Sequence, residues 1–342
     1  MLAILSPDAT LAQQGQPNGP PQPADTSPHT VQFVAVEKDV KLEVLDWGGS
    51  GHPLLLLAGM GFDAHVYDTF APKLVLQFHV YGIPRRGFGA SSAPKPECGN
   101  YSPDRLGDDV LAVMDDLRIE RPILVGHSLA GEELSSIGTR VPEKVAGLVY
   151  LDAGYSYAYY DPSLPNGDPV MDSAELRKEM DQMFTIASPR ERKVQVKHLL
   201  EESLPRFEKD LQEVQKQLQS VPDSAPAPPD SSMARSVGEI QRSVQIYKGV
   251  KCPVLAVFAV PHKLDPRPGM DAASQAAATA DELARTSAQV NAFEVGNPQA
   301  RIVRLPNADH FVFRSNEADV LREMNAFLAT LKCTMRGSIK HA

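Results

Sequence analysis

The chain has 342 residues, of which 42% are hydrophobic and 23% are charged, and these ordinary values exclude a fibrous repeat or a globally disordered chain. The net charge of −9 comes without a long run of one sign, so neither a nucleic-acid-binding surface nor a nucleic-acid partner is expected. No apolar run reaches the roughly 18 residues that cross a bilayer, so no membrane span is expected.

The first 30 residues differ in composition from the rest of the chain. Residues 1–5 are apolar, and Thr10-Leu11-Ala12 is similar to the small-residue cleavage site of an export signal, although no Lys or Arg precedes Lys38. Residues 13–30 are rich in Gln, Pro, Gly and Asn and are too polar to pack. We predict that residues 1–30 are a shortened export signal with a Pro-rich tail, which implies a secreted or periplasmic protein. The alternative is a disordered tail on a cytoplasmic protein.

From Val31 onward, apolar segments typical of strands alternate with amphipathic segments typical of helices. Short, wholly apolar runs at 54–57 and 123–125 are typical of strands that are buried on both faces of a parallel sheet. We therefore predict an α/β fold, with a mostly parallel central sheet and helices on both of its faces. The segment 65–76 has helical spacing and is expected to be one of these helices.

The alternation is interrupted between residues 155 and 250, where charged helical segments and a Pro-rich run occur. We predict four parts after the tail: a first core part at 31–154, a helical insertion at 155–250, a second core part at 251–334 and a short tail at 335–342. The insertion begins with four tyrosines, Tyr155, Tyr157, Tyr159 and Tyr160, which either line a pocket or pack the insertion against the sheet. Its helices are expected to form a lid; a homodimer surface is the alternative.

The sequence GHSLAG at 126–131 follows an apolar run and opens a helical segment, which is the context of a nucleophile elbow. On so sharp a turn the Ser hydroxyl points away from the sheet, and the residues two before and two after it must be small. Gly126 and Ala130 meet this requirement. Ser128 is therefore the predicted nucleophile, and the free N–H of Leu129 at the start of the helix is a predicted oxyanion donor.

These segments resemble the α/β-hydrolase superfamily over roughly residues 31–153 and 250–331. The resemblance implies an inserted helical lid, and it implies that the N–H of Met60, in the loop after the 54–57 run, is the second oxyanion donor. The loop 85–92 is similar to the one after the family's fourth strand. The loop 306–311 lies where the family carries its general base, so His310 is the residue predicted to take the Ser proton and later return it.

The acid of the predicted triad has two candidates. The family's usual position is the loop after the 254–260 strand, where the acid is Asp265, a few residues later than is common. Some members, haloalkane dehalogenases among them, place it after the preceding strand, where this chain has Asp152. We favour Asp152, because a strand end holds a carboxylate more rigidly than a Pro-rich loop, and we keep Asp265 as the alternative.

The nucleophile also bears on the reaction. Haloalkane dehalogenases and epoxide hydrolases that resemble this chain carry an Asp at the elbow, whereas position 128 is Ser. A Ser–His pair favours acyl transfer through an acyl-enzyme, so we expect hydrolysis of a small-molecule carboxylic ester with no metal and no other cofactor. The alternatives are a C–C bond hydrolase or cofactor-free peroxidase on the same triad, and a ligand-binding homologue without turnover.

Overall fold

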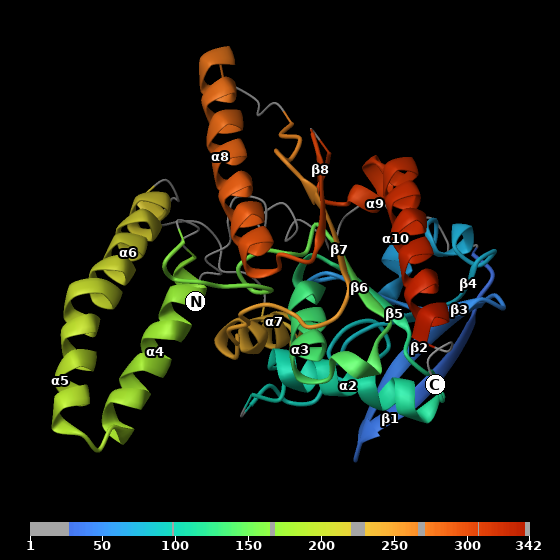
Figure 1. Ribbon diagram of the computed structural model, residues 1–342, viewed down its shortest axis with the longest axis horizontal. Helices are drawn as coiled ribbons and strands as arrows, with labels where there is room; N and C mark the ends of the chain where they lie inside the picture. Colours follow the sequence, from blue (N-terminus) through green and yellow to red (C-terminus); the bar gives the residue numbers. More distant parts are fainter. Residues whose placement is uncertain are drawn as a thin grey trace.

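The computed structural model describes residues 27–338, apart from 98, 165–167, 220–229, 266–270 and 307. Most of the predicted export signal and tail at 1–30 thus lies outside the described residues. Eight strands form one sheet in the order β1-β2-β4-β3-β5-β6-β7-β8 (Figure 1). The strands are β1 (Thr30–Glu37), β2 (Val40–Gly48), β3 (His52–Leu57), β4 (Phe78–Ile83), β5 (Ile123–His127), β6 (Gly147–Leu151), β7 (Val254–Ala259) and β8 (Arg301–Leu305).

The sheet is mostly parallel, as predicted. β1 pairs with β2, and β2 with β4, in the antiparallel sense. The pairs from β4 through β3, β5, β6 and β7 to β8 are all parallel. β5, β6 and β7 are buried at every position, which is why their sequences are apolar without alternation. Their carboxyl ends lie side by side, and the candidate site lies at this edge.

Helices cover both faces of the sheet, which confirms the predicted α/β class. One face packs against α2 (Pro103–Asp116), α3 (Gly131–Arg140) and α8 (Ala272–Gly296). The other face packs against α9 (Val312–Ser315), α10 (Glu317–Ser338) and the short turns near residue 67. α10 therefore continues through 335–338, where the sequence predicted a tail.

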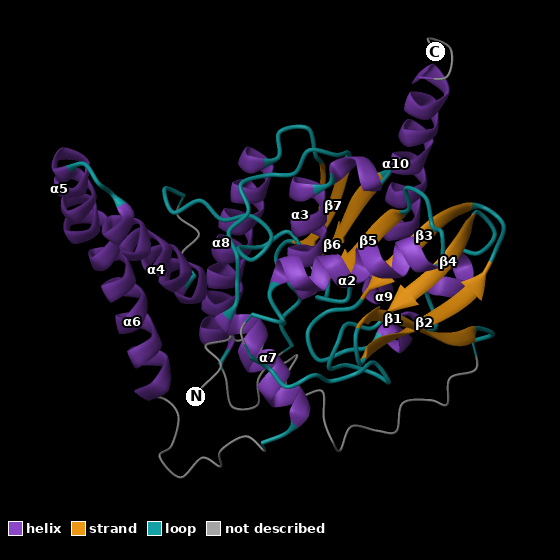
Figure 2. Ribbon diagram, turned by 90° about the horizontal axis from the view of Figure 1, so that it is seen from below, coloured by secondary structure: helices purple, strands orange, loops and turns teal. Residues whose placement is uncertain are grey.

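Four helices lie between β6 and β7: α4 (Pro169–Thr185), α5 (Pro189–His198), α6 (Leu204–Gln219) and α7 (Ser232–Arg242). α4, α5 and α6 form an arm that projects from the sheet, whereas α7 lies close to the core (Figure 2). Within the described part of the chain, no helix is long and apolar enough to cross a membrane.

One predicted helix is wrong in detail. The segment 65–76 forms two 3₁₀ turns, η1 (Ala64–Tyr67) and η2 (Ala71–Lys73), instead of one continuous helix. Pro72 explains the break, because proline has no N–H to donate and its ring clashes with the preceding helical turn. The apolar spacing of the segment still serves packing, since Val66 and Phe70 are buried in the core.

Candidate active site

Ser128 occupies the turn between β5 and α3 with a backbone φ of 51°, in the left-handed region that side chains other than glycine rarely adopt. Small neighbours make this turn possible. A Cβ atom on Gly126 would lie 2.9 Å from the side chain of Leu134 and 3.1 Å from Cβ of Ala130. A Cβ on Gly131 would meet the carbonyl oxygen of Ala153 at 1.9 Å, so this glycine lets α3 approach the chain that follows β6.

His310 lies between Ser128 and Asp152. Its Nε2 atom is 2.9 Å from Oγ of Ser128, and its Nδ1 atom is 2.6 Å from Oδ2 of Asp152. Because an ionised carboxylate only accepts hydrogen bonds, Nδ1 carries a proton, and in the neutral ring Nε2 is then free to accept from the Ser128 hydroxyl. The structure thus brings together three of the residues that the sequence selected: the predicted nucleophile, the predicted base and one of the two predicted acids.

Asp152 follows β6 with a φ of 49° and is fully buried. Four donors surround its carboxylate. Oδ1 accepts from the hydroxyl of Tyr155 at 2.5 Å and from the N–H of Ala259 at 2.9 Å, and Oδ2 accepts from His310 and from Nε2 of His262, both at 2.6 Å. Burial alone would raise the pKa of Asp152, but the charge and hydrogen bond of His262, followed by those of His310, hold that pKa well below its usual range. Asp152 is therefore an ionised, immobilised acceptor.

Asp265, the other candidate acid, is exposed on the loop after β7. Among the described residues of that loop, His262 reaches the site, and it was not predicted to have a role. A parallel bridge joins His262 to Ala308, so the loops after β7 and β8 run side by side beneath the two imidazoles. One feature of the sequence could have identified His262: it follows a buried strand, β7, by three residues, and β7 neighbours β6 in the sheet.

His127, next to Ser128 in the sequence, contacts the backbone of the loop that carries His310. Its Nε2 atom donates to the carbonyl oxygen of His310 at 3.0 Å. Burial, with a smaller effect from the charge of His310, holds the pKa of His127 well below its ordinary value, so the ring is neutral. His127 therefore acts as a neutral donor that positions the His310 backbone.

The loop after β3 lies directly against the elbow. A Cβ on Gly59 would lie 3.0 Å from Cβ of Ser128 and 3.0 Å from Nδ1 of His127, so only glycine allows this approach. The next residue is Met60, whose N–H the resemblance selected as an oxyanion donor, and Leu129 follows Ser128 at the start of the helical turns. Both residues belong to one apolar cluster beside Ser128.

Arg85 holds this loop in place. Its guanidinium donates to the carbonyl oxygens of Gly59 at 3.0 Å and Ala58 at 2.8 Å, and it forms a two-pronged ion pair with Glu133 of α3 at 2.9 Å. The carbonyl of Gly59 and the N–H of Met60 belong to the same trans peptide group and point in opposite directions. By fixing the carbonyl, Arg85 also fixes the direction of the Met60 N–H.

A family model described as the alpha/beta hydrolase family matches residues 54–323. The chain belongs to the α/β-hydrolase family. A fluoroacetate dehalogenase from Burkholderia sp is 34% identical over 116 residues, which cover 33% of this chain and 38% of that protein. The bifunctional epoxide hydrolase 2 of Mus musculus is 26% identical over 181 residues, which cover 48% of this chain and 32% of that protein. This α/β-hydrolase therefore matches well under half of the length of either relative.

Solved structures show the same fold. The carboxylesterase CesB from Bacillus subtilis has a TM-score of 0.51 and 17% identity, and the match covers 88% of this α/β-hydrolase and 92% of that chain. At this identity the likeness concerns the fold alone.

An apolar cluster lies next to Ser128 in this α/β-hydrolase. Its members come from the loops after β3 and β4, from the elbow, from α2 and from the insertion: Met60, Phe88, Tyr101, Leu106, Leu129, Tyr157, Val237 and Ile240. Of the four tyrosines that begin the insertion, Tyr157 belongs to this cluster, and Tyr155 bonds to Asp152. The insertion thus contributes to the surroundings of the site through Tyr157 and α7.

Glu132, on the first turn of α3, is fully buried, and neither of its carboxyl oxygens has a hydrogen-bond partner among the described residues. Burial, with a further contribution from the charge of Glu133, raises its pKa well above the ordinary value, while the charge of Arg85 opposes this effect. Glu132 therefore holds its proton to a higher pH than an exposed carboxyl group does.

Asp152, His262 and His310 are also the group that could hold a metal ion within the described ranges, because one ligand atom from each lies within 4.8 Å of the others. The hydrogen-bond distances of 2.6 Å at both imidazoles are those of ring N–H groups that point at the carboxylate. We interpret the group as two imidazoles that are hydrogen-bonded to one carboxylate oxygen.

Proposed function

We propose that this α/β-hydrolase is a serine hydrolase that cleaves a small carboxylic ester, or a related acyl bond, through an acyl-enzyme. The observation that carries the proposal is the contact of 2.9 Å between Oγ of Ser128 and Nε2 of His310, together with the bond from Nδ1 of His310 to Asp152. Fold alone does not imply this activity, whereas a nucleophile, a base and an orienting acid in contact do.

In the proposed reaction, Ser128 attacks the carbonyl carbon while its proton moves to Nε2 of His310. The imidazolium then returns the proton to the leaving alcohol, and an ester bond to Oγ of Ser128 remains. Water attacks this acyl-enzyme in the second half-reaction, with His310 again taking a proton. Asp152 keeps Nδ1 protonated and stabilises the imidazolium in both halves.

The tetrahedral intermediates carry a negative oxygen, for which we propose the N–H groups of Met60 and Leu129 as donors. The proximity of Gly59 to Cβ of Ser128 supports the role of the Met60 loop, and the carbonyl bonds of Arg85 support a fixed direction for its N–H. Donors that are already oriented need no rearrangement when the charge develops.

Ester cleavage distinguishes this chain from the dehalogenase and the epoxide hydrolase that it matches. Those classes resemble this chain in fold but carry an Asp at the elbow, and a carboxylate nucleophile forms an ester that water must open. Ser128 as nucleophile instead requires a substrate with an acyl carbon. The apolar cluster around Met60, Leu129 and Tyr157 supports an aliphatic or aromatic acyl group of modest size.

A panel of p-nitrophenyl esters of increasing acyl length tests the proposal. We expect hydrolysis of short acyl groups by the wild-type protein and loss of this activity in Ser128→Ala. Ser274→Ala is the matched control, because Ser274 is exposed on α8, away from Ser128 and His310. Equal activity in all three proteins would refute the proposed function.

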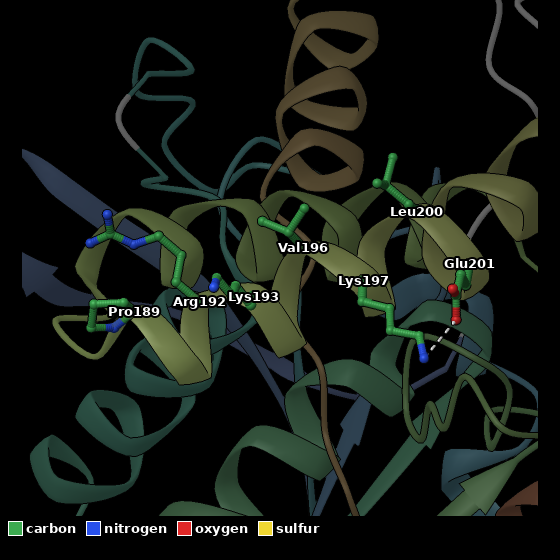
Figure 3. Close-up of a pocket in the computed structure, with 7 residues that line it drawn as sticks. All are labelled: Pro189, Arg192, Lys193, Val196, Lys197, Leu200 and Glu201. Atoms are coloured by element: carbon green, nitrogen blue, oxygen red, sulfur yellow. Dashed lines mark ion pairs between the residues drawn. The ribbon is translucent and has the colours of Figure 1, made fainter.

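We also propose that the arm formed by α4, α5 and α6 contributes to a homodimer. The arm exposes large apolar side chains, with Phe184 exposed to 73%, Val194 to 66% and Leu200 to 62%. Figure 3 shows a hollow along α5 and the π-helical turn η5 (Leu199–Ser203) that follows it. Val196 and Leu200 lie there beside Lys197 and Glu201, which form an ion pair of 3.7 Å. Light scattering on the wild-type protein and on Phe184→Ser tests the proposed dimer. We expect the wild-type protein to be a dimer and Phe184→Ser to be a monomer. A wild-type protein that stays monomeric at high concentration would contradict the proposal.

A further inference from the structure

A second imidazole, that of His262, contacts the same carboxylate oxygen as the base. Its Nε2 atom lies 2.6 Å from Oδ2 of Asp152, and its Nδ1 atom lies 2.6 Å from Oε1 of Glu282 on α8. The ring is buried, and its centroid is 5.6 Å from that of His310. The mechanism proposed above uses one imidazole, so the second needs its own explanation.

The hydrogen bonds determine the protonation of His262. Carboxylate oxygens accept hydrogen bonds, and both ring nitrogens of His262 face such an oxygen. Burial would raise the pKa of Glu282, but the hydrogen bond with His262 and the charge of Arg285 outweigh it and lower that pKa. Asp152 is likewise ionised, so both nitrogens donate, and the ring of His262 is an imidazolium.

Among the described residues, the titratable and charged groups that the structure places against His262 come from three segments. The segment after β6 supplies Asp152 and Tyr155, the segment after β8 supplies His310, and α8 supplies Glu282, which in turn pairs with Arg285. A buried carboxylate without charge compensation would be costly, and the His262 imidazolium provides that compensation at Oδ2 of Asp152.

We propose that His262 is a positioning residue of this active site: as an imidazolium held by Glu282, it fixes the Asp152 carboxylate and weakens the negative field that this carboxylate exerts on His310. The inference rests on the proposed function. Two consequences follow from it. Asp152 stays in one orientation, and the positive charge of His262 offsets part of the negative charge that His310 faces.

The sign of the pH effect can be stated for His262→Gln. Glutamine retains a donor toward Asp152 but removes the positive charge, so Asp152 becomes easier to protonate. A protonated Asp152 no longer orients His310 as the base. The acid limb of kcat/KM therefore moves to higher pH, and kcat on the plateau falls because the Asp152 carboxylate is held less firmly.

Three variants make the test specific: His262→Gln, Glu282→Gln and, as the control, His79→Gln. His79 also bonds to a carboxylate, Asp46, at 2.8 Å, but it lies on β4 outside the site. The pH profile of kcat/KM on p-nitrophenyl acetate is the measurement. We expect its acid limb to move to higher pH in His262→Gln, to move less in Glu282→Gln and to stay in place in His79→Gln. A limb that stays in place, or moves to lower pH, in a folded His262→Gln protein overturns the proposal.

If His262→Gln does not fold, a measurement on the wild-type protein still tests the charge of the His262 ring. Nitrogen-15 NMR of the histidine rings is expected to show one imidazolium that remains protonated at mildly alkaline pH and changes in Glu282→Gln. A neutral His262 ring at neutral pH overturns the proposal. These outcomes are distinct from failure of the proposed function, which would appear as hydrolysis that survives Ser128→Ala.

Discussion

Nδ1 of His310 lies 2.6 Å from Oδ2 of Asp152, although 158 residues separate them in the sequence. The contact exists because β6 and β8 flank β7 in one parallel sheet, so that their carboxyl ends open toward the same edge. The contact joins His310, the proposed base, to the end of β6. The loop after β7 lies between them in the sheet order and places a second histidine, His262, against the same carboxylate.

The first prediction concerns the acid. Asp152→Asn is expected to lower kcat by about 10⁴-fold, because an amide has one accepting oxygen in place of two. Its NH₂ group must face either the two imidazoles or the donors Tyr155 and Ala259, and it favours the wrong tautomer of His310. Asp265→Asn, an equally conservative change at an exposed position, is expected to leave kcat close to wild type. Steady-state kinetics on one ester decides between them. If Asp265→Asn is the inactive variant, the assignment of Asp152 is wrong.

The second prediction concerns the close approach of the β3 loop to the elbow. Gly59→Ala places a methyl group 3.0 Å from both Ser128 and His127, so either these side chains or the loop that carries the Met60 N–H must give by a few tenths of an ångström. We expect kcat to fall by about 10²- to 10³-fold, the usual cost of losing one oxyanion donor. Gly238→Ala on α7, where the added Cβ meets nothing within 4 Å, is the control. Unchanged kcat in Gly59→Ala would argue against an oxyanion site at this loop.

The third prediction separates stability from positioning at Arg85. Arg85→Met leaves Glu133 as an unpaired buried charge and is expected to cost about 3–5 kcal/mol of unfolding free energy. The double variant Arg85→Met/Glu133→Gln removes the unpaired charge, so most of that stability returns, while kcat stays low because the carbonyls of residues 58 and 59 are no longer held. Urea unfolding and kcat, measured on both variants, test this. Recovery of kcat together with stability would show that Arg85 has no positioning role.

The fourth prediction concerns the pH dependence of stability at Glu132. Its pKa is raised in the folded protein, so the unfolded chain releases this proton at lower pH, and folding is penalised increasingly as pH rises toward the folded-state pKa. Glu132→Gln removes this penalty. The difference in unfolding free energy between variant and wild type is expected to grow by up to about 1.4 kcal/mol per pH unit above the unfolded pKa. If the unfolding free energies of the two proteins change with pH in parallel, the pKa of Glu132 is not raised in the folded protein.

The sequence was most informative where local pattern and position agree. Ser128 sits in a turn whose small neighbours are encoded within six residues, and His310 follows the last strand and precedes a closing helix. The apolar runs of β5, β6 and β7 identified a parallel sheet, because strands buried on both faces have no polar alternation.

Other parts of the site depend on distances that no local pattern records. The choice between Asp152 and Asp265 required the path of the loop after β7, which turns His262 inward and leaves Asp265 exposed. The partnership of His262 with Glu282 joins a loop to a helix 20 residues away, and the bond from Arg85 to the β3 loop spans 26 residues. Such polar contacts carry no periodic signal.

Covalent capture of Ser128 tests the central claim most directly. A fluorophosphonate probe reacts with a serine whose hydroxyl is activated by an adjacent base, and intact-mass and peptide analysis locate the adduct. The account predicts one adduct per chain on Ser128, its loss in Ser128→Ala and its retention in Ser274→Ala. A folded wild-type protein that forms no adduct, or forms one at another residue, would contradict the assignment of Ser128 as the nucleophile.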